Sequence, residues 1–238
     1  MLVIFDCDGV LIDSEVIFCA VDADALTQLG YPTQASDLLE RFVGVSHHEA
    51  WGQLAAELGL DLPDNWVESI LRECDRRFAT ELVAVPGTVA TLQAIGESGH
   101  AVCVASSTEL GRLRTNLANA GILSQVEPWV FSASQVKRPK PAPDVFMFAA
   151  AQMGFDPSEI LVIEDSVAGV TAARRAGMQV LGFTGGSHAY DSLGPRLVAA
   201  GAQATFASMA HLLEGILHHL RNHSLAATTT QVRVQAGV

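Results

Sequence analysis

The chain has few cysteines and few basic residues, and each shortage excludes a class of protein. Its four cysteines lie far apart and form no CxxC pair, so we expect neither a zinc site nor a disulfide framework. Only 14 basic residues accompany 26 acidic ones, which gives a net charge of −12. Nucleic-acid-binding proteins carry a basic patch or stripe, and the sequence shows none. We therefore expect no nucleic-acid partner.

Long apolar runs are also missing, although 49% of the residues are hydrophobic. No run reaches the length that a membrane-spanning helix needs. The N-terminus has no basic segment before a long apolar stretch and no small-residue cleavage site, so it does not resemble a signal peptide. We therefore expect a cytoplasmic protein that does not bind membranes. The sequence leaves the oligomeric state open, a monomer included.

The chain of 238 residues is long enough for one large domain, or for a core with a smaller insertion. Residues 2–5 form a short apolar run, which is typical of a strand buried on both faces. Residues 15–82 then carry four helical patterns and no strand signal. From residue 84, strand and helix patterns alternate, which is typical of a parallel sheet with helices on both faces.

These patterns predict an α/β fold, a Rossmann-like parallel sheet core flanked by helices, with an inserted four-helix subdomain. The last segment is polar and threonine-rich and lacks a helical period, so we expect it to be disordered. The predicted divisions are a core of residues 1–14 and 84–223, a helical insertion of residues 15–83 and a disordered tail of residues 224–238.

Several boundaries can be predicted from capping residues. Ser14 precedes the first helical pattern and is predicted to cap it, and Ser46 with Glu49 forms an S-x-x-E capping box before the third. Strands are predicted at residues 101–105, 129–131, 160–163, 178–183 and 204–206. The final helix is predicted at residues 208–221.

Polar residues gather where these strands end or where a loop opens a helix. The carboxyl ends of parallel strands share one edge of a sheet, so these residues should converge there. Carboxylates, a hydroxyl and a lysine suit a divalent cation and a phosphate, because Mg²⁺ binds carboxylate oxygens together with waters and phosphate oxygens. The residues concerned are Asp6, Asp8, Ser106, Ser107, Lys140, Glu164 and Asp165.

Each of these residues also has an ordinary structural explanation. Asp6 and Gly9 could belong to a turn that ends a strand, since both residue types are common in turns. Ser106 could cap a helix. Asp165 could be an acid favoured by the dipole at a helix start, and Lys140 could be a loop lysine.

Taken together, the motifs resemble those of the haloacid dehalogenase-like (HAD) phosphohydrolases. Asp6-x-Asp8-Gly9-Val10-Leu11 resembles the first motif of this family, Ser106 the second, and Lys140 in Lys-Pro-Ala-Pro-Asp the third. Glu164-Asp165-Ser166, followed by Gly169, resembles the fourth. The insertion is similar to the small helical cap of the branch containing β-phosphoglucomutase and sugar-phosphate phosphatases. Residues 6–15 and 41–45 particularly resemble the 6-phosphogluconate and polyol-phosphate phosphatase-like members.

The resemblance implies a role for each motif residue. Asp6 would be the nucleophile that forms an aspartyl-phosphate, and Asp8 the general acid and base. Lys140 would act in catalysis and in phosphate binding, the latter with Ser106 and Ser107. Mg²⁺ would be held by Asp6, Asp165 and the backbone carbonyl of Asp8, with Glu164 as a partner that acts directly or through water.

Residues of the cap should determine the substrate. His47 and His48 lie beside a helix start in a segment that faces the active site in relatives, and Arg41 lies just before them. The alternative is that the two histidines are ordinary surface residues. His188 follows the last long core strand and could line the rim of the site.

The cap also separates two activities that share the same core. Phosphomutase relatives carry a histidine twelve residues after the nucleophile, where this chain has Phe18, and an arginine where it has His47. We therefore predict a Mg²⁺-dependent phosphomonoester hydrolase that acts on a small phosphorylated sugar, sugar acid or polyol. A β-phosphoglucomutase-like phosphomutase is the alternative. A non-catalytic phosphometabolite-binding protein is a further one, but it would be expected to have lost one of the catalytic groups, all of which are present.

Overall fold

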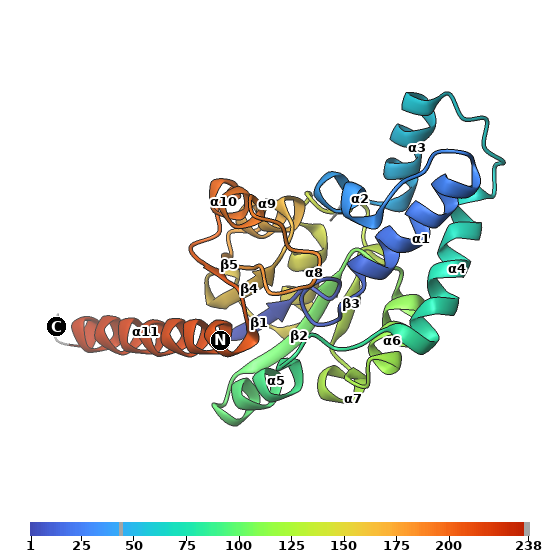
Figure 1. Cartoon of the computed structure of the whole chain (residues 1–238). Helices are drawn as coiled ribbons and strands as arrows, with labels where there is room; N and C mark the ends of the chain where they lie inside the picture. The colour runs from blue at the N-terminus through green and yellow to red at the C-terminus, as the bar shows by residue number, and fades with distance from the viewer. Residues whose placement is uncertain (43–44, 236–238) are drawn as a thin grey trace.

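A parallel β-sheet forms the centre of the computed structural model, which describes residues 1–42 and 45–235, with side chains to residue 223. Its six strands lie in the order β3-β2-β1-β4-β5-β6, and all neighbouring strands are parallel (Figure 1). The strands are β1 (Leu2–Phe5), β2 (Ala101–Ser106), β3 (Val130–Ser132), β4 (Ile160–Glu164), β5 (Gln179–Phe183) and β6 (Thr205–Phe206). The predicted α/β fold is confirmed.

Strand β1 is buried on both faces, as its apolar run predicts. Val3 and Phe5 face one hydrophobic cluster, and Leu2 and Ile4 face the other. The first cluster is built with α5 (Thr88–Glu97), α6 (Leu110–Asn119), α7 (Leu123–Val126) and α11 (Met209–Gln235). The second is built with α8 (Asp144–Met153), α9 (Val167–Arg175) and α10 (Leu193–Ala200). Helices therefore cover both sides of the sheet.

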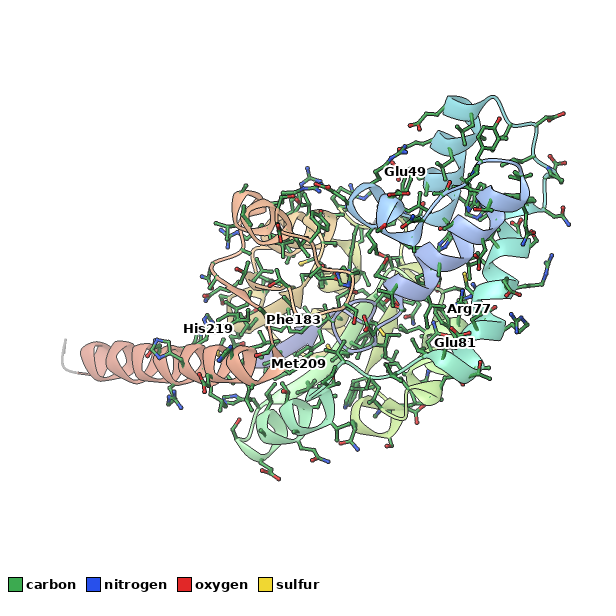
Figure 2. The ribbon with its side chains drawn as sticks, viewed as in Figure 1. Glu49, Arg77, Glu81, Phe183, Met209 and His219 are labelled. Atoms are coloured by element: carbon green, nitrogen blue, oxygen red, sulfur yellow. The ribbon has the colours of Figure 1, made fainter. Side chains whose placement is uncertain are left out.

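Four helices between β1 and α5 form a separate group at one side of the sheet (Figure 1). They are α1 (Glu15–Gln28), α2 (Ala35–Phe42), α3 (His47–Leu58) and α4 (Trp66–Glu81). Helix α1 packs on α2 and α4, and α4 also contacts α3 and, across the junction with the core, α6. Arg77 and Glu81 form an ion pair of 2.7 Å along α4 (Figure 2).

The chain leaves the core and returns to it at one place. Where the chain leaves the core, the backbone N–H of Asp13 donates to Val83 O at 3.0 Å. Where the chain returns, the backbone N–H of Val85 donates to Leu11 O at 2.9 Å. We propose on this ground that the cap is bounded near residues 14 and 84.

Two segments differ from the sequence prediction. Helix α10 was not predicted, because Gly194 and Pro195 interrupt its apolar pattern, although proline is tolerated in a first turn. Helix α11 continues to Gln235, through most of the segment predicted to be a disordered tail, and extends away from the sheet (Figure 1). No glycine or proline lies between residues 216 and 235 to end it. Residues 236–238 of that prediction lie outside the described residues.

Among the described residues, no helix has both the length and the apolar character needed to cross a lipid bilayer.

Candidate active site

Asp6 follows the central strand β1 at the carboxyl edge of the sheet. Phe5 is in register with Val104 of β2 and Ile163 of β4, so Asp6 lies level with Ala105 and Glu164. The N–H of Asp6 donates to Ile163 O at 2.9 Å, which continues the strand pairing by one residue. The strand order reverses on either side of β1, and open α/β sheets bind ligands at such a point.

Lys140 joins the residues that end these three strands. Its Nζ donates to Asp6 Oδ1 at 2.8 Å, to Glu164 Oε1 at 2.7 Å and to Ala105 O at 3.1 Å. The lysine side chain is only 4% exposed. Burial by itself would lower the pKa of Lys140, but the charges of Asp6 and Glu164 outweigh burial and raise it. The ammonium group is therefore a fixed positive charge within the site.

Three carboxylates lie close together, and two of them contact this lysine. Asp6, Glu164 and Asp165 are buried, and each offers an oxygen within 4.8 Å of the others. Burial raises the pKa of Asp6 well above its usual range, Lys140 opposes this, and the neighbouring acids add to it. The centre thus carries more negative charge than its lysine neutralises.

The donor set fits a hard divalent cation such as Mg²⁺. Asp165 is buried and its Oδ2 lies 3.0 Å from His188 Nε2, so a cation would bind the other carboxylate oxygen of Asp165. The three carboxylates lie close enough together to share one cation. Glu164 is less available than Asp6 and Asp165. Its Oε1 accepts from Lys140, and its Oε2 accepts from the N–H and Oγ of Ser166 at 3.0 Å each.

Three hydroxyl groups hold the carboxylate of Asp8. Oδ1 accepts from Ser14 Oγ at 2.8 Å, while Oδ2 accepts from Thr108 Oγ1 at 2.8 Å and from Ser106 Oγ at 3.2 Å. Ser14 occupies the predicted N-cap position of α1, but its side chain makes no capping hydrogen bond to the helix. Sequence reasoning missed Ser14 and Thr108 as site residues, although Thr108 lies only two residues beyond Ser106. Ser107 is exposed.

Two glycines make room for the acids. A Cβ on Gly169 would lie 1.7 Å from Glu164 Oε1, so the first turn of α9 can rest on this carboxylate only without a side chain there. Gly9 has a φ of +72°, and a Cβ there would lie 2.0 Å from Asp165 Oδ2. Both glycines lie in the motifs that the sequence singled out, and both allow close approach of backbone to carboxylate.

The cap histidines differ in their surroundings. His47 Nε2 lies 3.7 Å from Asp22 Oδ2, and its ring meets the Phe18 ring edge-on at 4.7 Å. Burial lowers the pKa of His47 to about 4, helped by the charges of Arg112 and His48. His47 is therefore neutral near pH 7 and does not form an ion pair with Asp22 there. His48 is exposed.

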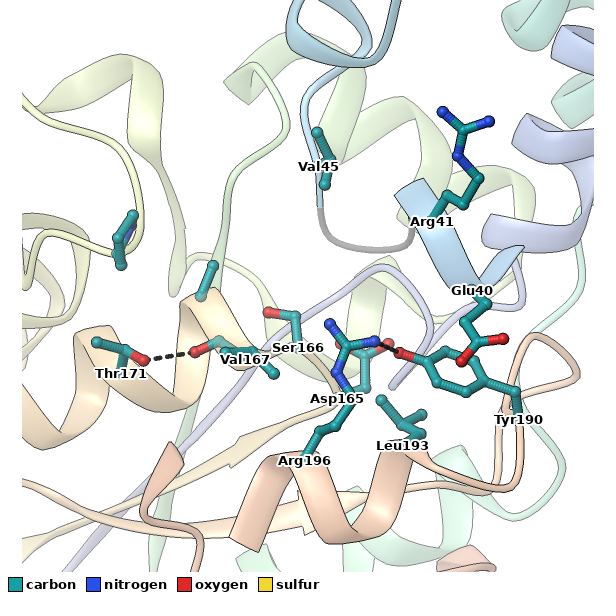
Figure 3. Close-up of a pocket in the computed structure, with 12 residues that line it drawn as sticks. Glu40, Arg41, Val45, Asp165, Ser166, Val167, Thr171, Tyr190, Leu193 and Arg196 are labelled. Carbon is teal, nitrogen blue, oxygen red and sulfur yellow. Dashed lines mark hydrogen bonds between the residues drawn. The ribbon is translucent and has the colours of Figure 1, made fainter. Parts of the chain in front are cut away.

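A cavity of about 320 Å³ lies between the cap helix α2 and the core helices α9 and α10 (Figure 3). Asp165 and Ser166 lie on its core side, and Arg41 lies on its cap side. Arg41 is engaged with Glu57 at 2.7 Å. The cavity is also lined by Glu40, Val45, Pro141, Val167, Ala168, Thr171, Tyr190, Leu193 and Arg196.

Arg196 and Tyr190 supply hydrogen-bond donors to this cavity. Arg196 Nη1 donates to the hydroxyl oxygen of Tyr190 (Figure 3). This leaves the hydroxyl proton of Tyr190 and the other N–H groups of Arg196 for a ligand. Within the described residues, Arg196 forms no ion pair with a carboxylate.

The prediction that His188 lines the rim of the site is wrong. Its side chain is fully buried, and its Nε2 lies 3.0 Å from Asp165 Oδ2. The sequence places His188 after β5, but only the fold of the following loop turns it inward.

A parallel sheet with buried acids beside a lysine at its carboxyl edge, and with a helical insertion beside that edge, has the fold and the charged groups of an α/β enzyme. Residues 3–183 match the haloacid dehalogenase-like hydrolase family. The chain belongs to this family, and the resemblance seen in its motifs is confirmed.

Three relatives show how similar the chain is to characterised and solved members. It is 31% identical to the 6-phosphogluconate phosphatase of Escherichia coli over 187 residues, 78% of this chain and 83% of the relative. It is 30% identical to the phosphorylated carbohydrates phosphatase of Thermotoga maritima over 203 residues, 85% and 92% of the two chains. The crystal structure of a haloacid dehalogenase-like protein of unknown function from Agrobacterium tumefaciens superposes with a TM-score of 0.84 at 35% identity, covering 92% of this chain and 98% of that one.

Proposed function

We propose that this protein is a Mg²⁺-dependent phosphomonoester hydrolase acting on a small phosphorylated sugar, sugar acid or polyol. The observation that carries the proposal is the contact of Lys140 with both Asp6 and Glu164, beside Asp165. The arrangement supports Asp6 as the nucleophile, since its carboxylate would lie between the Lys140 ammonium group and a bound cation.

The charge of the substrate explains why this countercharge is needed. A phosphate dianion about 4 Å from a carboxylate is repelled by roughly 8 kcal/mol at an effective dielectric constant near 20. Lys140 offsets part of this repulsion. Bound Mg²⁺ would supply further positive charge and polarise a phosphoryl oxygen. The Mg²⁺ would be held by Asp6, Asp165 and the backbone carbonyl of Asp8. Glu164 would instead hold Lys140 in place.

In the first step, a carboxylate oxygen of Asp6 attacks phosphorus, and the bond from phosphorus to the alcohol oxygen breaks. Asp8 donates its proton to the departing alcohol. In the second step Asp8 takes a proton from water, which attacks phosphorus and releases Asp6 and phosphate. The hydroxyls of Ser14 and Thr108 hold Asp8 in place for both transfers. Ser106 and Ser107 would bind the phosphoryl group.

The cavity beside Asp165 is suited to the rest of the substrate. Its donors, Arg196 and Tyr190, would bind the hydroxyl or carboxylate oxygens of a sugar or sugar acid. The names of the Escherichia coli and Thermotoga maritima relatives support a phosphorylated carbohydrate. Arg41 would contribute from the cap side, and His47 and His48 are cap residues that can adjust the choice of substrate.

The structure around Phe18 favours hydrolysis over phosphomutase activity. Its ring packs edge-on against His47 at 4.7 Å and against Phe78 at 4.9 Å. A phenyl ring cannot exchange a proton with the general acid at the position where mutase relatives carry histidine. We also propose a cytoplasmic location, which the four unpaired cysteines support.

A panel of sugar, sugar-acid and polyol phosphates, assayed for phosphate release with and without Mg²⁺, tests the proposal. We expect release from at least one class of substrate, and loss of release when Mg²⁺ is chelated. Conversion of β-glucose 1-phosphate to glucose 6-phosphate without phosphate release would instead identify a mutase.

A further inference from the structure

His188 is a buried histidine in contact with one of the acids. It follows β5 in the loop that leads to α10, and its side chain is fully buried. Its Nε2 lies 3.0 Å from Asp165 Oδ2, and both ring nitrogens and this oxygen otherwise lack hydrogen-bond partners among the described residues. A buried polar ring would be costly here without a function, because each unpartnered polar atom loses its contacts with water.

The ring occupies a space that two glycines create for it. A Cβ on Gly9 would lie 2.6 Å from His188 Cε1, and a Cβ on Gly186 would lie 2.6 Å from both Cε1 and Nδ1. The same Cβ on Gly9 would also lie only 2.0 Å from Asp165 Oδ2. The backbone of the first motif therefore packs directly on the contact between His188 and Asp165.

The loop carrying His188 is tied to the same stretch of chain that carries the catalytic acids. The N–H of Ser187 donates to Asp13 Oδ1 at 3.1 Å, and its Oγ donates to Asp13 Oδ2. The next residue, Ser14, donates to Asp8. Two adjacent residues thus support both acids. Ser14 contacts Asp8 directly, and Asp13 supports Asp165 through the loop that carries His188.

The geometry points to His188 as the positioning residue of Asp165: its Nε2–H holds Oδ2, so that the other carboxylate oxygen of Asp165 is oriented toward the cation. Asp13 and Ser187 hold His188 at that place. The inference rests on the proposed function, because it assigns His188 a role in Mg²⁺ binding. His188 itself touches neither the cation nor the substrate in this assignment.

Mg²⁺ binding can be measured without catalysis, from the rise in Tm of the metal-free protein as Mg²⁺ is added. Removing a group that orients a metal ligand typically costs 10–100-fold in affinity, so we expect His188→Leu to raise the Kd for Mg²⁺ by about 10-fold or more. The KM for the phosphorylated substrate and kcat at saturating Mg²⁺ should change by less than about 3-fold, since the ligand itself remains. His188→Gln, which keeps an N–H at similar reach, should restore most of the affinity.

Ser187→Ala covers the case in which His188→Leu does not fold, because Ser187 is exposed and its loss leaves the core intact. It should raise the Kd for Mg²⁺ by about 3-fold, a smaller effect because the ring remains. His211→Leu, at an exposed histidine on α11, is the matched control and should bind Mg²⁺ as the wild type does.

Wild-type affinity for Mg²⁺ in folded His188→Leu and in Ser187→Ala would overturn the assignment while leaving the proposed function intact. A wild-type protein whose Tm does not respond to Mg²⁺ would overturn both.

Discussion

Nζ of Lys140 lies 2.8 Å from Oδ1 of Asp6, although 134 residues separate the two in the sequence. The contact joins the end of β1 to the loop before α8, and it places a buried cation beside a buried anion. Because the same ammonium also binds Glu164 of β4, one side chain connects the two central strands where they end.

Removing this cation should damage both stability and activity. Lys140→Met leaves Asp6 and Glu164 buried without their partner, so the free energy of unfolding of the metal-free protein should fall by about 3–5 kcal/mol. The kcat should fall by about 10²–10³-fold, because a fixed charge is lost at the phosphoryl group. Urea unfolding and phosphate-release assays measure the two effects. Lys137→Met, at an exposed lysine of the same loop, should change neither, and a matching loss there would show that the loop rather than the charge is responsible.

Gly169 should be intolerant of a methyl group although it lies in a helix. Glycine to alanine in a helix normally stabilises a protein by about 0.5–1 kcal/mol. At Gly169 the Cβ would lie 1.7 Å from Glu164 Oε1, so Gly169→Ala should instead lower the free energy of unfolding by about 1–3 kcal/mol. Gly52→Ala in α3 is the control, since nothing lies within 4 Å of its Cβ, and it should be stabilising. Equal Tm shifts in the two variants would contradict the close packing of α9 on Glu164.

The buried carboxyl group of Asp22 should lower the stability of the cap at neutral pH. Burial raises the pKa of Asp22 from 3.8 to about 6, opposed by a hydrogen bond from the Trp51 indole. The protonated carboxyl therefore favours the folded state at low pH, and this contribution, about 2–3 kcal/mol, is lost as the pH rises from about 4 through 6. Asp22→Asn keeps an acceptor for Trp51 and removes the charge. Its gain over the wild type should be near zero at pH 4 and reach about 2–3 kcal/mol above pH 6.

His47 has the opposite effect on the pH dependence of stability. Its pKa of about 4 lies below the ordinary value of 6.5, so the free energy of unfolding falls as the pH is lowered from 6.5. His47 is neutral above about pH 6, so above that pH the difference between Asp22→Asn and the wild type reports Asp22. Denaturant unfolding at several pH values gives the comparison, with exposed Asp24→Asn as the control. A pH-independent difference between Asp22→Asn and the wild type would disprove the assignment.

Arg196 should discriminate between substrates by charge. If its free N–H groups bind a substrate carboxylate, Arg196→Gln should lower kcat/KM for 6-phosphogluconate by about 10–100-fold, the value of a charge-assisted hydrogen bond. A neutral polyol phosphate should lose less than about 3-fold. Arg138→Gln, at an exposed arginine paired with Asp144, should leave both values unchanged. Equal losses on the two substrates would show that Arg196 does not contact the carboxylate.

The fold and the central site could be predicted because they depend on local patterns. The apolar run before Asp6 predicts a doubly buried strand, and a parallel sheet then brings Asp165 and Lys140 to the same edge. Strand ends are set by local sequence, so residues that follow strands are predictable neighbours.

Side-chain direction was not predictable in the same way. Ser14 has the sequence context of a helix cap, and it turns toward Asp8 instead because that acid lies within reach in the folded loop. His188 turns inward because Gly9 and Gly186 leave space for its ring, a relationship between distant segments. Helix α10, which carries Arg196, was hidden by a glycine and a proline in its first turn.

Turnover of Asp6→Asn, compared with the wild type at saturating Mg²⁺ on the best substrate of the panel, tests the central claim most directly. A carboxamide at position 6 cannot form the phosphorylated intermediate, so phosphate release should fall by at least about 10³-fold while the protein remains folded. A folded Asp6→Asn protein that keeps wild-type turnover would contradict the account.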